Sequence, residues 1–96
     1  MSDCVFCKIV AGELPASVVY EDDQLLAFAS IEPKADTHLL VIPKRHIENL
    51  DALTAGDAEL ISHLMLTLPG IAEKAGLSGY RTITNTGVAG GQEVFH

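Results

Sequence analysis

Two cysteines near the start of the sequence, Cys4 and Cys7, form a C-x-x-C motif. Such a motif indicates either a redox pair or half of a metal site, and two unrelated small apolar residues are the plainer alternative. A redox pair usually begins a helix that follows a strand in a βαβ unit, and no strand pattern precedes Cys4. His46 and His96 offer the other half of a Cys2His2 set, which suits tetrahedral zinc. The spacing alone leaves these alternatives open.

The segment Gly87-Val88-Ala89-Gly90-Gly91 is rich in glycine. Glycines let successive backbone N–H groups point into one concavity, as they do in phosphate-binding loops. The pattern differs from the dinucleotide motif GxGxxG, and we expect a strand after it where that motif has a helix. An ordinary flexible hairpin loop is the alternative, because glycine clusters are mainly turn signals.

Composition restricts the partners that such a chain could have. The chain has 96 residues, 48% of them hydrophobic, and a formal net charge of −7. Grooves for polymeric DNA or RNA need a basic face, so we expect no nucleic-acid polymer as a partner. A mononucleotide remains open, because backbone amides can hold one phosphate. We find no signal peptide and no apolar run of about 20 residues, and we expect a cytoplasmic protein without membrane contact.

The apolar pattern predicts two helices. The first is a short turn within residues 4–12, ending near Gly12. The second is long, from about Thr54 to Ala75, because its apolar residues recur every three or four positions. Thr54 and Asp57 resemble a capping box, and Gly76 is a natural stop.

The strands are expected to form a mostly antiparallel sheet of about five. Two belong to a hairpin over residues 17–30, and the others are expected at 37–44, 80–85 and 93–96. The order of elements favours the α+β class. The last segment is only four residues long and its apolar pattern continues to His96. We therefore expect residues 1–96 to form a single domain that lacks its C-terminal end.

Four segments resemble the histidine triad (HIT) family, in the right order and over nearly the whole chain. They are Phe6 to Pro15, Val19 to Phe28, Thr37 to His46 and Asn85 to His96. The most similar branch is the bacterial Hint-like one, which carries the same Gly-Gly-Gln-Glu-Val run. The family signature is His-φ-His-φ-His-φ-φ, with φ apolar, and His96 matches its first histidine. The resemblance thus implies a HIT-like fold with a long helix and a short N-terminal helix.

This resemblance implies an enzyme, a hydrolase or nucleotidyl transferase acting on purine nucleoside phosphoramidates or adenylates. In the family the second histidine attacks the α-phosphorus and forms a covalent nucleotidyl-histidine. The two later histidines would lie beyond residue 96, so we expect the chain as given to be inactive. One alternative is a catalytically silent nucleotide-binding module, and another is a zinc-stapled interaction module.

The family pattern also implies the site residues. Catalytic roles fall on His96 and on His38, which the family places near the nucleophile. The residues expected to bind a purine nucleotide are Val5, Phe6, Ile9, Leu14, Ser30, Ile31, Asn85, Gly91, Gln92 and Glu93. For the apolar ones, plain core packing is the alternative. Ser30 departs from the family, whose members often have an aspartate there for the ribose hydroxyls.

Some bacterial HIT proteins with an N-terminal C-x-x-C bind zinc, and the matching residues here are Cys4, Cys7, His46 and His96. A closed set of four leaves no coordination position for substrate, so the resemblance implies a structural zinc. Family members pair as homodimers through the long helix and a sheet edge, and we expect a homodimer here too.

Overall fold

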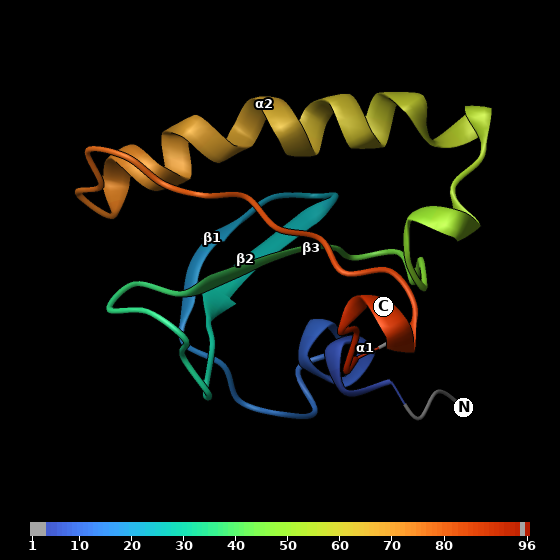
Figure 1. Cartoon of the computed structure of the whole chain (residues 1–96), viewed down its shortest axis with the longest axis horizontal. Coiled ribbons are helices and arrows are strands. Elements are labelled where there is room, and N and C mark those ends of the chain that lie inside the picture. Colours follow the sequence, from blue (N-terminus) through green and yellow to red (C-terminus); the bar gives the residue numbers. More distant parts are fainter. Residues whose placement is uncertain (1–3, 95) are drawn as a thin grey trace. The chain divides into compact units, whose positions relative to one another are not determined.

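The computed structural model of the chain describes residues 4–94 and 96 (Figure 1). These residues fall into two compact units, one formed by residues 4–46 with His96 and the other by residues 47–94. Among the described residues, no helix has both the length and the hydropathy needed to cross a bilayer.

The first unit contains a three-stranded antiparallel sheet in the order β1-β2-β3 (Figure 1). Its strands are β1 (Val18–Glu21), β2 (Leu25–Ala29) and β3 (Leu39–Pro43). Asp22 shapes the turn between β1 and β2, because its Oδ1 accepts the N–H groups of Gln24 and Leu25, both at 2.8 Å. The expected hairpin and the expected strand at 37–44 are thus confirmed.

Helix α1 (Val5–Val10) packs on one face of this sheet. Leu26 pairs with Ile42 and Phe28 pairs with Leu40 across β2 and β3, so their side chains share that face. Leu26, Phe28 and Ile42 are buried there, and Phe6 of α1 meets Phe28 edge to face with ring centroids 5.5 Å apart. This apolar cluster fixes where α1 lies against the sheet.

The second unit contains the long helix α2 (Ala58–Lys74), which follows the 3₁₀ turns η1 (Leu50–Ala52) and η2 (Ala55–Asp57). The capping box is present: Thr54 N–H donates to Asp57 Oδ2 at 2.9 Å. Gly76 ends the helical segment with a φ of 75°. The long helix and its start signal are therefore confirmed.

The expectation of about five strands is wrong, because the described residues form three. Residues 80–85 are exposed and belong to no strand, since β-branched side chains favour a strand only where a neighbouring strand completes the ladder. Residues 93, 94 and 96 are not in a strand either, and residue 95 lies outside the described residues. The Val94 carbonyl accepts a hydrogen bond from the Gln92 side chain at 3.2 Å, a local bond in place of a ladder bond.

Candidate functional site

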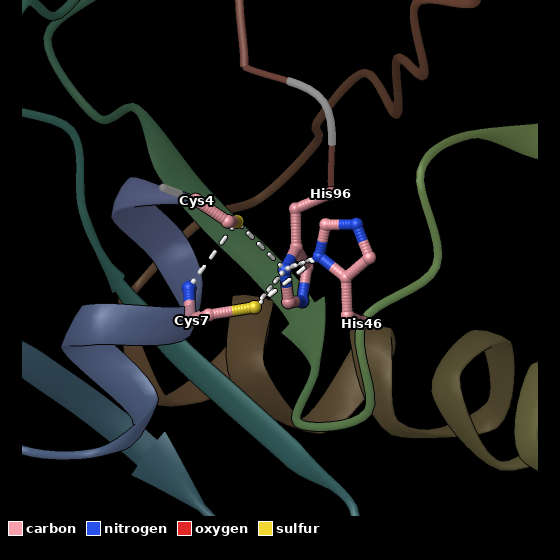
Figure 2. A group of neighbouring side chains, drawn as sticks. All are labelled: Cys4, Cys7, His46 and His96. Carbon is pink, nitrogen blue, oxygen red and sulfur yellow. Dashed lines mark hydrogen bonds between the residues drawn. The ribbon is translucent and has the colours of Figure 1, made fainter. Parts of the chain in front are cut away.

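Four metal-ligand side chains converge in the first unit (Figure 2). Cys4 caps the N-terminus of α1, Cys7 lies within α1, His46 follows β3, and His96 returns from the other end of the sequence. One ligand atom from each residue lies within 4.8 Å of all the others. The geometry brings together the whole set that sequence analysis selected.

Four of the six separations between the ligand atoms are close to the edges of a coordination tetrahedron. The Cys7 Sγ–His46 Nδ1, Cys4 Sγ–His96 Nδ1 and His46 Nδ1–His96 Nδ1 distances are all 3.2 Å, and the Cys7 Sγ–His96 Nδ1 distance is 3.4 Å. Tetrahedral zinc, with Zn–N and Zn–S bonds of about 2.05 and about 2.3 Å, has N–N edges of about 3.3 Å and N–S edges of about 3.6 Å. The observed distances are shorter by no more than a few tenths of an ångström.

The ring of His96 is oriented with Nδ1 toward the cluster. Its Nε2 lies 2.8 Å from the carbonyl oxygen of Pro43, and a carbonyl can only accept, so Nε2 carries the proton. Burial is the main cause of the lowered pKa of His96, and the nearby His46 lowers it further, against the Pro43 hydrogen bond, which raises it. The neutral ring with a free lone pair on Nδ1 is the form that binds metal.

Hydrogen bonds alone fit this cluster poorly. The Nδ1 lone pair of His96 can accept one direct hydrogen bond, yet Cys4 Sγ, Cys7 Sγ and His46 Nδ1 all lie within 3.4 Å of it. A cation at the centre would use all four groups as donors of electron pairs. The donor set, two sulfurs and two imidazoles, therefore fits a metal ion.

The helix and the core hold this cluster in place. The Cys7 N–H donates to Cys4 Sγ at 3.3 Å, so the first turn of α1 sets the separation of the two cysteines. Phe6 contacts His96 edge to face at a centroid distance of 5.9 Å and contacts Phe28 of the sheet from the same ring. Through Phe6, the ligand His96 is thus linked to the apolar cluster between α1 and the sheet.

The glycine loop lies in the second unit and includes the 3₁₀ turn η3 (Val88–Gly90). Gly87 and Gly91 have φ angles of 76° and 88°, a region that side-chain-bearing residues rarely adopt. The N–H groups of Gly90 and Gly91 donate to the carbonyls of Gly87 and Val88, both at 3.0 Å. Asn85, which precedes the loop, donates from its side-chain Nδ2 to the Gly91 carbonyl at 3.4 Å.

Comparisons with known proteins agree with this architecture. Residues 3–96 match the family model described as the scavenger mRNA decapping enzyme C-terminal binding domain. An uncharacterized HIT-like protein of Synechococcus elongatus is 53% identical over 98% of this chain and 83% of its own length. Protein HitA of Neisseria gonorrhoeae is 47% identical over 100% of this chain and 91% of its own length. The chain belongs to the HIT family.

Solved structures support the same assignment. A HIT family hydrolase from Legionella pneumophila matches with a TM-score of 0.94 and 47% identity, over 98% of this chain and 86% of its own. One from Clostridium thermocellum matches with a TM-score of 0.95 and 43% identity, over 100% and 85% of the two chains. The HIT-like fold is therefore confirmed.

The nucleotide-binding residues expected in the first unit lie in different environments. Phe6 and Ile9 pack against the core cluster, so they also fulfil the plain packing role. The side chains of Val5, Leu14 and Ile31 are exposed, Ile31 to 94%. Contact of these residues with a base stays a prediction.

Two polar residues of the first unit are held by backbone groups between β2 and β3. Ser30 Oγ accepts the Glu32 N–H at 3.2 Å, and His38 Nδ1 accepts the Lys34 N–H at 3.0 Å. The second bond leaves the proton of a neutral His38 ring on Nε2. Their roles toward ribose and phosphate stay predictions.

Sequence analysis missed the groups that orient the HIT signature region. Pro43 contributes only its carbonyl, which accepts from His96, and no residue type signals such a role. Asn49 donates from Nδ2 to Gln92 Oε1 at 3.1 Å, and Gln92 is buried. A glutamine next to a glycine loop is a weak signal of burial. The sequence therefore could not predict that Gln92 pairs with Asn49, 43 positions earlier.

Proposed function

We propose that this chain is a nucleotide-binding domain of the HIT hydrolase type, acting on purine nucleoside phosphoramidates or adenylates. The observation that carries the proposal is the glycine loop at 87–91, which leads to His96 inside a region that matches HIT proteins from end to end. Relatives with this fold are named HIT family hydrolases. Asn85, Gly91 and Glu93 would approach the phosphate, Glu93 through its backbone N–H, because a carboxylate beside a phosphate is unfavourable.

The reaction proposed is nucleotidyl transfer to a histidine. A neutral imidazole nitrogen attacks the α-phosphorus and forms a P–N bond, while the bond to the leaving group breaks. The leaving group departs as an amine that takes up a proton, or as a carboxylate. Water then attacks the phosphorus and loses a proton, the P–N bond to histidine breaks, and the nucleoside monophosphate and free histidine are released. His96 is poorly suited to be that nucleophile, because Nε2 donates to Pro43 and Nδ1 faces the metal ligands. The second histidine of the signature is the better candidate, and the 96 residues do not include it.

A structural zinc is the second part of the proposal. Cys4, Cys7, His46 and His96 would hold it, and a closed set of four protein ligands leaves no coordination position for substrate. When bound, zinc would link α1, the end of β3 and His96 of the signature segment rather than take part in catalysis. Zinc ligation would also keep His96 neutral and in one orientation.

Homodimerisation is the third part. Met65 and Leu66 of α2 and Ile83 are exposed apolar residues of the second unit, to 54%, 81% and 63%. Met65 and Leu66 are adjacent in the sequence of this long helix, and exposed apolar surface that is contiguous is typical of interaction sites. They support the family-type pairing through the long helix.

Calorimetric titration of the zinc-loaded chain with AMP, GMP and adenosine tests the proposal. We expect both nucleotides to bind at least about tenfold more tightly than adenosine, because the loop amides would interact with the phosphate. Equal binding of AMP and adenosine would contradict the proposal.

The four-ligand cluster favours a second candidate, a zinc-stapled interaction module without a nucleotide role. Its closed ligand set would stabilise the first unit whatever the loop does. The same titration distinguishes the two candidates, because a zinc-loaded chain that binds neither AMP nor GMP would favour the second.

A further inference from the structure

Gln92 is the buried polar residue at the end of the glycine loop, exposed to 9%. Its side-chain Oε1 accepts hydrogen bonds from Gly87 N–H at 2.7 Å and from Asn49 Nδ2 at 3.1 Å. Its Nε2 donates to the carbonyls of Glu48 at 2.6 Å and Val94 at 3.2 Å. A primary amide has two acceptor lone pairs and two donor hydrogens, so all four of its hydrogen-bonding positions are filled.

The bonds between Gln92 and Gly87 run in both directions. The Gln92 backbone N–H donates to the Gly87 carbonyl at 3.1 Å, while Gly87 N–H donates to the Gln92 side chain. These two bonds close the loop, because they join its first residue, Gly87, to Gln92, which directly follows the loop. They also hold Gly87 at its positive φ, because both polar groups of that residue are engaged by one partner.

The remaining bonds fix the closed loop to a second segment. Asn49 and Glu48 lie more than forty positions earlier in the sequence, and Gln92 bonds to both. The loop backbone alone is glycine-rich and gives up much conformational entropy when it is ordered. A buried and fully bonded amide is therefore the group that selects one loop shape.

We propose that Gln92 is a positioning residue, which holds the glycine loop at 87–91 in a phosphate-receiving shape and does not itself contact the nucleotide. The phosphate part rests on the proposed function, whereas the anchoring of the loop does not. A side chain without a spare donor or acceptor has nothing left to offer a phosphate unless it breaks an internal bond. This replaces the direct nucleotide contact expected for Gln92 from the sequence.

The substitution Gln92→Met tests the anchor, because methionine has a similar length and no amide. Gln24→Met is the matched control, since Gln24 is an exposed glutamine of the β1–β2 turn in the other unit. Amide hydrogen exchange at Gly87, followed by NMR, is the direct readout. We expect exchange to speed up at least about tenfold in Gln92→Met and to stay unchanged in Gln24→Met. Unchanged exchange at Gly87 in a folded Gln92→Met variant would overturn the proposal.

Titrations with AMP and adenosine supply a readout that a merely structural role would not move. We expect Gln92→Met to weaken AMP binding at least about tenfold and to leave the weaker adenosine binding unchanged. Loss of AMP binding with normal Gly87 exchange would make Gln92 a direct ligand and overturn the proposal. If the unmodified chain binds no AMP, the proposed function fails, and Gly87 exchange alone decides the anchor.

Asn49→Ala provides a milder variant in case Gln92→Met does not fold. It removes one of the two bonds to Gln92 Oε1 and keeps the bond to Gly87. We expect a change at Gly87 of the same sign and only a few-fold in size. No change at Gly87 would count against the network.

Discussion

The metal-ligand cluster and the glycine loop are each held together, but in different ways. In the cluster, Cys4 and His96 meet although 92 positions separate them, and their ligand atoms crowd around one point. In the loop, Gly87 and Gln92 are only five positions apart. The side-chain amide of Gln92 accepts two hydrogen bonds at Oε1 and donates two from Nε2, one to each neighbouring group. The first arrangement could hold a metal ion, and the second is complete without one.

This difference predicts different dependences on metal. With zinc bound as proposed, the cluster would gain most of its stabilising free energy from metal coordination. A saturated amide network gains its free energy from its internal bonds and from its burial. Metal removal should therefore loosen the first unit and leave the hydrogen bonds of Gln92 intact.

The largest effect is expected from Cys4→Ala, which removes a ligand and the side-chain cap of α1. We expect zinc content to fall from about one per chain to near zero. The free energy of unfolding should fall by about 3 kcal/mol or more, a decrease of about 12–24 °C in Tm for a domain of this size. Elemental analysis and calorimetry measure both quantities.

His63→Ala is the matched control for metal content. His63 lies on α2 in the second unit. It and His38 are the two histidines that do not belong to the cluster. Zinc content should stay at about one per chain in this variant. A Cys4→Ala protein that kept its zinc would refute the assignment of the cluster.

A smaller effect is expected from Asp57→Ala at the start of α2. The buried Asp57 carboxylate accepts the Thr54 N–H at 2.9 Å and lies 3.3 Å from Thr54 Oγ1. Loss of this box should reduce the free energy of unfolding by about 1–2 kcal/mol. Zinc content should not change, because the cap lies in the unit without the ligands. Parallel loss of zinc, measured on the same sample, would show that the two regions are not independent.

The four residues of the cluster could be selected from sequence because cysteine and histidine are few and their chemistry is specific, and the structure brings these four together. The α1 and α2 helices and the β1–β2 hairpin could be predicted because caps, turn residues and apolar periodicity act locally. The strands expected at 80–85 and 93–96 were wrong because a strand exists only with its partner, and pattern does not show whether the partner is there.

The role of Gln92 and its link to Asn49 were beyond sequence reasoning for a related reason. The amide of glutamine suits a nucleotide and a protein backbone equally well, so the residue type cannot tell which of them it meets. Burial decides between them, and burial follows from the path of the whole second unit. The same holds for Pro43, whose carbonyl orients His96.

The smallest effect is expected from Glu21→Gln, which tests the other polar link in the first unit. Lys44 Nζ donates to Glu21 Oε2 at 2.7 Å, but the two side chains are exposed to 27% and 54%. Water screens such a pair, so its loss should change the free energy of unfolding by less than about 1 kcal/mol. The difference should shrink further in high salt, because the Debye length falls to about 3 Å at 1 M. Chemical denaturation by urea at two salt concentrations measures this, and a loss comparable with that of Cys4→Ala would mean that surface charge, not metal, ties β1 to the end of β3.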